Sequence, residues 1–99
     1  MSEIDYTILT DEELIQLVQK GEMKAFDKLV FRFKDRLLIY VNGYMRDYEM
    51  SQNLVQDTFV KVFQKADTYK EIAKFSTWIY TIAGNLAKTE LRKLKRRQT

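Results

Sequence analysis

The sequence predicts a compact all-α domain built from four helices. Proline is absent and only three glycines occur in 99 residues, and these two residue types oppose helix formation most strongly. Apolar residues also recur at spacings of three and four along several segments, which is the period of an amphipathic helix. A chain of this length is expected to form a single domain, residues 1–99.

The first helix is predicted from the stretch ILTDEELIQLVQKG. Thr10, followed three residues later by Glu13, has the pattern of a capping box, and Leu9 can pack against Leu14 as a hydrophobic staple. Gly21 indicates where this helix stops.

The second helix is expected from about Met23 to Met45, with Gly43 weakening its end. Its apolar stripe consists of Phe26, Leu29, Val30, Phe33, Leu37, Tyr40, Val41 and Tyr44.

The third helix is expected from about Glu49 to Ala66, with one buried face and one polar face. The buried face consists of Leu54, Val55, Thr58, Phe59, Val62 and Phe63. The polar face carries Asn53, Gln56, Asp57, Lys61 and Gln64.

Residues 67–75 interrupt the pattern and are expected to form a loop. Ser76 or Thr77 should then cap a fourth helix that continues to about Arg96. Its inward positions are Trp78, Ile79, Ile82, Ala83 and Leu86. Because the chain stops within a basic segment that has no cap or glycine after it, we expect it to be part of a longer protein.

The composition argues against an enzyme. The chain has no Cys and no His, which removes thiolate sites, the commonest general base and the commonest metal ligand. No glycine-rich phosphate loop is present. We therefore expect no catalytic residue, metal, cofactor or small-molecule substrate. No apolar run approaches a membrane span of ~20 residues and no signal peptide is evident, so a cytoplasmic protein is expected.

Charge is divided unevenly along the chain. Residues 1–50 hold 7 Lys/Arg and 10 Asp/Glu, whereas residues 51–99 hold 10 Lys/Arg and 4 Asp/Glu. The resulting net charges of −3 and +6 indicate a polyanionic partner at one end of the fold, most often nucleic acid. A membrane surface is a weaker alternative, because it requires an exposed apolar stripe beside the cations and the fourth helix needs its stripe for the core.

The basic run near the end of the chain is the first candidate binding feature. It consists of Lys88, Arg92, Lys93, Lys95, Arg96 and Arg97, opposed only by Glu90. One or two cations would complement the dipole of the helix end. Six exceed that role, and phosphate binding is the better interpretation.

Asn85 and a group of aromatic residues are the other candidate features. Asn85 is a poor helix former; its amide can bond a neighbouring helix, face water, or donate to and accept from a base edge. Aromatic residues near a helix start usually belong to the core, yet beside cations they can also stack on unpaired bases. The aromatic group is Tyr69, Phe75, Trp78 and Tyr80, interleaved with Lys70 and Lys74.

These segments resemble a known family. The stretch LVQDTFVKVFQKA, a short loop, and then KFSTWIYTIAGNLAKTELRKLKRR resemble domain 2 of bacterial sigma factors, specifically the extracytoplasmic-function (ECF) group. The upstream KGEMKAFDKLVFRFKDRLLIYVNGYM is similar to the preceding helix of that domain. The resemblance covers about residues 11–97 and implies the N-terminal part of a longer transcription initiation factor.

The resemblance implies three partners. The third helix would dock on the clamp helices of the RNA polymerase β′ subunit through Asn53, Leu54, Gln56, Asp57 and Phe63. The loop and fourth helix would recognise and melt the promoter −10 element by capturing bases of its non-template strand. The residues implied for the captured bases and their phosphates are Tyr69, Lys70, Lys74, Phe75, Ser76, Thr77 and Trp78. Asn85 and Lys88 would contact the upstream duplex edge, and Arg92, Arg96 and Arg97 its backbone. Anti-sigma factors commonly regulate this family, so such a partner is also implied.

Four positions differ from those of related sigma factors. Family members usually carry an acid at the position of Asn53, and many carry Arg at that of Gly84. Primary sigma factors place a pair of Trp residues where this chain has Thr81 and Ile82. Promoter opening should then depend more on favourable sequence and on base capture. The alternative to the sigma interpretation is a helical protein-interaction module without a DNA role, which predicts no preference for single-stranded DNA.

Overall fold

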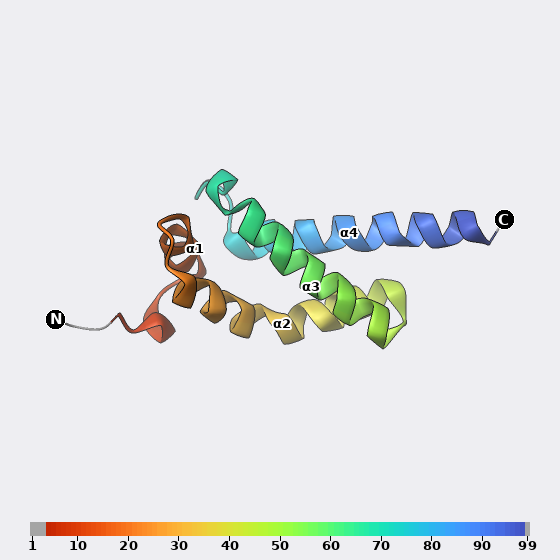
Figure 1. Ribbon diagram of the computed structural model, residues 1–99, viewed down its shortest axis with the longest axis horizontal. Helices are drawn as coiled ribbons and strands as arrows, with labels where there is room; N and C mark the ends of the chain where they lie inside the picture. The colour runs from red at the N-terminus through yellow and green to blue at the C-terminus, as the bar shows by residue number, and fades with distance from the viewer. Residues whose placement is uncertain (1–3, 99) are drawn as a thin grey trace.

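The computed structural model describes residues 4–98 and contains four α-helices in that range. The helices are α1 (Asp11–Gln19), α2 (Met23–Met45), α3 (Tyr48–Gln64) and α4 (Phe75–Arg97) (Figure 1). Two short 3-10 turns, Tyr6–Ile8 and Ala66–Thr68, precede α1 and follow α3. The predicted all-α, four-helix fold is confirmed.

Local signals place the boundaries of α1 where the sequence predicts them. The N–H of Glu13 donates to Thr10 Oγ1 at 3.0 Å, and the Glu13 carboxylate accepts from the Thr10 N–H at 2.8 Å, so the capping box is complete. Gly21, just beyond the helix, has φ +93, a conformation that residues with a Cβ rarely adopt.

The ends of α2 and α3 differ slightly from expectation. α2 has the predicted bounds, and Arg46 in the left-handed region terminates it. Asp47 then caps α3 by accepting from the Met50 N–H at 2.9 Å. α3 ends at Gln64 instead of Ala66, and the chain continues as the 3-10 turn. In that turn the Ala66 carbonyl accepts from the side chain of Gln19 at 2.8 Å.

The start of α4 corrects the predicted cap. Ser76 and Thr77 do not cap this helix, because it already begins at Phe75, with Lys74 as an N-cap residue that makes no side-chain bond. The N–H of Phe75 instead donates to Glu12 Oε2 of α1 at 2.7 Å. A carboxylate from a distant helix thus supplies both the acceptor and the negative charge that a helix N-terminus favours.

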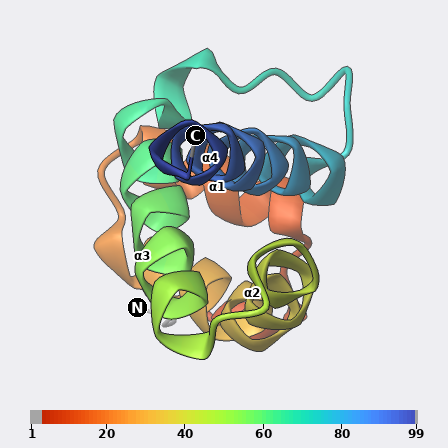
Figure 2. The same ribbon diagram turned by 90° about the vertical axis from the view of Figure 1, so that its right-hand side faces the viewer.

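The molecule is elongated, 60 × 23 × 19 Å along its principal axes. α2, α3 and α4 pack together around a core that includes Phe33, Leu37, Val62 and Ile79, all fully buried. α1 lies across the end of this bundle where α4 begins (Figure 1). The end-on view shows α3 along one side of α2 and α4, and the loop before α4 arching away from the helices (Figure 2).

α4 is long enough to leave the body of the domain. Its 23 residues correspond to about 34 Å at 1.5 Å per residue. Its last buried residue is Ala87, and the turns beyond it project past α2 and α3 (Figure 1). Leu91 and Leu94 on this projection are only partly buried.

Candidate nucleic-acid interface

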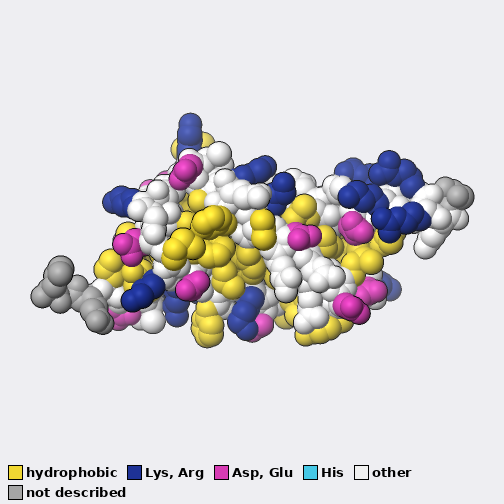
Figure 3. Space-filling view, viewed as in Figure 1, with side chains coloured by type: hydrophobic (Ala, Val, Ile, Leu, Met, Phe, Trp, Pro, Cys, Tyr) yellow, Lys and Arg dark blue, Asp and Glu magenta, His cyan; other side chains and the backbone are white. Residues whose placement is uncertain are grey.

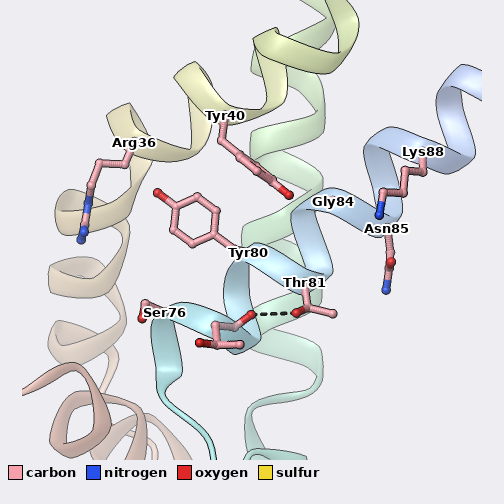
Figure 4. Close-up of a pocket in the computed structure, with 9 residues that line it drawn as sticks. Arg36, Tyr40, Ser76, Tyr80, Thr81, Gly84, Asn85 and Lys88 are labelled. Atoms are coloured by element: carbon pink, nitrogen blue, oxygen red, sulfur yellow. Dashed lines mark hydrogen bonds between the residues drawn. The ribbon is translucent and has the colours of Figure 1, made fainter.

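A hollow between α2 and α4 brings several predicted DNA contacts together (Figure 4). Its volume is about 620 Å³. Four of its lining residues are predicted site residues, Ser76, Thr77, Asn85 and Lys88. The other five are Arg36, Tyr40, Tyr80, Thr81 and Gly84. The hollow is therefore lined by hydroxyl, amide and cationic groups, which suit a nucleotide better than an apolar ligand.

Small residues allow α4 to approach α2 at this place. Ala83, Gly84 and Ala87 are all buried on the inner face of α4. A Cβ on Gly84 would lie 3.0 Å from Tyr40 Oη. The absence of a side chain at Gly84 therefore leaves the space that the Tyr40 hydroxyl occupies. Position 84, where many family members carry Arg, thus faces α2 in this chain.

Two tyrosines form one wall of the hollow. The rings of Tyr40 and Tyr80 meet edge to face with centroids 4.9 Å apart, from opposite helices (Figure 4). Tyr40 Oη lies 3.4 Å from Tyr44 Oη. The hydrogen bond to Tyr44, and to a lesser extent burial, raises the pKa of Tyr40 above its ordinary value.

The sequence patterns did not point to Arg36 or Tyr40 as site residues, and Tyr80 entered only as a member of the candidate aromatic group. Arg36 and Tyr40 are four residues apart and so share one face of α2, which is a signal present in the sequence. Nothing in the sequence shows that this face meets α4. In the structure the Arg36 guanidinium lies 4.4 Å from the centroid of the Phe33 ring, which holds its charge beside the hollow.

The loop aromatics do not form the predicted stacking platform. Tyr69 is 5% exposed and Phe75 is fully buried, so no ring face of either is open to a base. Their rings lie 5.8 Å apart, and Tyr69 also meets Trp78 at 5.2 Å. Tyr69 and Phe75 are therefore core residues that support the loop, because the short 66–74 segment folds back onto α1 and the start of α4. Trp78 is half-buried and remains partly accessible.

The polar and cationic residues of the loop and of α4 are accessible. Lys70, Lys74 and Thr77 are exposed, and Ser76 is partly exposed. Ile72 at the loop tip is 94% exposed. Asn85 and Lys88 are exposed along α4, and both lie at the same end of the hollow (Figure 4).

The basic run continues the same surface along the projecting part of α4. Arg92, Arg96 and Arg97 are all exposed. Lys and Arg side chains cluster at this end of the molecule (Figure 3). Arg92 also donates to Thr89 Oγ1 at 3.2 Å. The hollow and the projecting cations form one band, called the α4 band below, from Ser76 to Arg97.

The predicted polymerase surface on α3 divides into accessible and buried residues. Gln56 and Asp57 are exposed, as their helical phase predicts, and Asn53 is exposed too. Leu54 is only 7% exposed and belongs to the core, so its burial gives no support to a place on a binding surface. Phe63, expected on the buried face, is 49% exposed, because it lies at the last turn of α3, where it contacts Phe26 alone among the aromatic rings described.

Two features are absent from residues 4–98, a cluster of metal ligands and a membrane-spanning helix. No group of three or more acidic side chains there could hold a metal ion. None of the helices in that range is long and apolar enough to cross a membrane.

Comparisons with known proteins agree with the geometry. The family model "Sigma-70 region 2" matches residues 29–97. The ECF RNA polymerase sigma-E factors of Salmonella typhimurium and Escherichia coli K12 are each 37% identical over 83 residues, which is 84% of this chain and 43% of theirs. The RNA polymerase sigma-H factor of Pseudomonas aeruginosa is 32% identical over 81 residues, 82% of this chain and 42% of that protein. The chain thus spans less than half the length of these curated relatives.

A solved structure extends the likeness to three dimensions. An engineered region 2 of sigmaE, determined by NMR in complex with GTAAAA, superposes with a TM-score of 0.83 at 39% identity. The match covers 98% of this chain and 97% of the other. With the family model matching most of the chain, the conclusion is plain: this chain belongs to the sigma-70 region 2 family, within the ECF group of sigma factors.

Proposed function

We propose that this domain binds core RNA polymerase and recognises the promoter −10 element by holding unpaired bases of the non-template strand. The observation that carries the proposal is the α4 band, in which a polar hollow and a run of exposed cations lie end to end. A single strand needs both parts, since cations track its phosphates and polar or aromatic groups meet its bases. The sigmaE neighbour bound to GTAAAA supports the same ligand class.

The buried loop aromatics change how bases would be held. Without Tyr69 and Phe75 as stacking surfaces, the accessible groups are the hydroxyls of Ser76 and Thr77, the Asn85 amide and the partly open Trp78. Hydrogen bonds to base edges carry more sequence information than stacking does. The domain should therefore discriminate among bases more than it binds any base tightly.

The domain alone recovers little of the free energy that melting costs. Unstacking costs a few kcal/mol per step, and the return of about 1–3 kcal/mol per stacked base is open only at the partly exposed Trp78. Thr81 and Ile82 provide no Trp wedge at the fork. Core polymerase must then supply part of the opening free energy, and the domain alone should bind single strands better than duplex.

Polymerase docking belongs on the exposed face of α3. Asn53, Gln56 and Asp57 lie on that face, and Phe63 is half-exposed at its end. Asp57→Lys should weaken binding to the β′ clamp helices, since charge reversal at an interface opposes docking by repulsion, and should leave helicity unchanged by circular dichroism. Equal affinity of the two proteins for core polymerase in a pulldown titration would remove this assignment. An anti-sigma partner stays a prediction.

DNA binding is best tested by fluorescence anisotropy with labelled oligonucleotides across a salt series. GTAAAA should bind more tightly than a composition-matched permutation such as AAGATA and than the corresponding duplex. With three to five phosphate contacts at about −0.7 each, the log–log salt slope should be roughly −2 to −3.5. Replacing Arg92, Arg96 and Arg97 with Ala should flatten the slope while keeping the base preference.

The same measurement separates the proposal from a protein-interaction module. Such a module would bind strand, permutation and duplex alike, or would bind none of them at low salt. Either result would exclude recognition of the −10 strand by this domain.

A further inference from the structure

Three side chains of α1 hold the loop that precedes α4. Glu12, Gln16 and Gln19 are spaced four and three residues apart and so lie on one face of the helix. Each makes a hydrogen bond to a residue between positions 66 and 75. The partners are 47 to 63 residues away in the sequence, so only the tertiary fold creates these contacts.

Gln19 holds the beginning of the loop. Its Nε2 donates to the Ala66 carbonyl at 2.8 Å and to the Tyr69 carbonyl at 3.1 Å, and both bonds are partly buried. One amide group therefore joins the 3-10 turn to the residue where the chain becomes extended. A side chain that bridges two carbonyls fixes the path of the backbone between them.

Glu12 holds the end of the loop. Its Oε2 accepts from the N–H of Phe75 at 2.7 Å. Phe75 is the first residue of α4. Since Lys74 provides no side-chain cap, Glu12 fixes the register at which the helix begins. Ser76, Thr77 and the rest of the α4 band follow from that start.

Gln16 holds the middle of the loop at its surface. Its Nε2 donates to Glu71 Oε2 at 2.9 Å in an exposed bond. Between these contacts, the side chains of Lys70, Ile72 and Lys74 are exposed and stay outside the core. Gln19 and Glu12 thus bond the loop backbone at Ala66, Tyr69 and Phe75, and Gln16 adds a bond to the Glu71 side chain.

Charge makes direct DNA contact by this part of α1 unfavourable. Its first turn consists of Asp11, Glu12 and Glu13, which would repel phosphate. Its influence on a nucleic acid must therefore pass through the loop that it holds.

We infer that Glu12, Gln16 and Gln19 are positioning residues that set the base preference of the domain by fixing the loop and the start of α4. The inference rests on the proposed function, because it concerns how the same surface discriminates among bases. A merely structural role predicts that their removal lowers stability without changing the ratio of affinities for two strands.

The test compares strand discrimination in matched variants. The Kd ratio for AAGATA over GTAAAA is measured by anisotropy in wild type, Gln19→Leu, Glu12→Ala and Glu12→Gln, with Gln64→Leu on exposed α3 as the control. Loss of one hydrogen bond corresponds to about a two- to tenfold change. Gln19→Leu and Glu12→Ala should lower the ratio by about that factor at an unchanged salt slope. Glu12→Gln keeps an acceptor oxygen and should restore the ratio, and Gln64→Leu should not alter it.

Amide exchange in the loop provides a second test in case Gln19→Leu or Glu12→Ala folds poorly. Gln16→Ala removes only an exposed bond, so it should fold, and amide exchange in residues 70–74 should be faster by about threefold, within the range for one hydrogen bond. Unchanged ratios in folded Gln19→Leu and Glu12→Ala, or unchanged loop exchange in Gln16→Ala, would overturn the inference while the proposed function stands. If wild type itself fails to distinguish the two strands, the proposed function fails and the inference falls with it.

Discussion

Alanine at position 84 tests how closely α4 approaches α2. Glycine within a helix costs about 1 kcal/mol relative to alanine, so Gly84→Ala would ordinarily stabilise the domain by that amount. Here the new Cβ would lie 3.0 Å from Tyr40 Oη, and the tyrosine would have to move by a few tenths of an ångström. The two effects oppose each other.

The cost of moving Tyr40 can be judged from its contacts. Its hydroxyl makes a long bond of 3.4 Å to Tyr44 Oη, and its ring packs edge to face on Tyr80 at 4.9 Å. Weakening one hydrogen bond costs about 0.5–1.5 kcal/mol. Gly84→Ala in wild type should therefore change the free energy of unfolding by less than about 0.5 kcal/mol. In a Tyr40→Phe background, which has no hydroxyl to displace, it should stabilise by about 1 kcal/mol.

The coupling between positions 84 and 40 is measured as a double-mutant cycle. Wild type, Gly84→Ala, Tyr40→Phe and the double variant are unfolded in urea and followed by far-UV circular dichroism. Gly43→Ala is the matched control, because a Cβ at Gly43 meets nothing within 4 Å and should be tolerated in both backgrounds alike. Equal stabilisation by Gly84→Ala with and without the Tyr40 hydroxyl would show that the close approach has no energetic consequence, and the reasoning would be wrong.

Two further outcomes follow from the aromatic cluster at the start of α4. Trp78→Ala should destabilise the domain by about 2–4 kcal/mol in urea unfolding, somewhat below the value for a fully buried tryptophan, because Trp78 is only half-buried; a loss below about 1 kcal/mol would contradict its packing role. Burial, then the charge of Glu12, raises the pKa of Tyr69 above its ordinary 10.0. The unfolded chain therefore loses this proton first, and stability should fall as pH rises above 10.0. Thermal melts across that range should show a shallower fall for Tyr69→Phe, and identical slopes would refute the assignment.

The sequence by itself determined the features that depend on near neighbours. The capping box of Thr10 and Glu13 joins residues three apart, and the stop at Gly21 depends on its own φ. The bounds of α2 and the exposed phase of Gln56 and Asp57 follow from a period of 3.6 residues, which any amphipathic helix obeys. The family resemblance was likewise readable from linear motifs.

Only the tertiary structure decided which side chains meet across the fold. The cap on α4 comes from Glu12, 63 residues from Phe75. No signal close to the helix start could have indicated it, and a cap by Ser76 or Thr77 was therefore predicted wrongly. Tyr69 became a core residue because the loop folds back onto α1. The hollow needed Arg36 and Tyr40 from α2, which sequence periodicity could place on one face but could not place opposite Asn85. Periodicity specifies the face of a helix and leaves its neighbour open, because the contacts between helices are set by how complementary side chains pack in three dimensions.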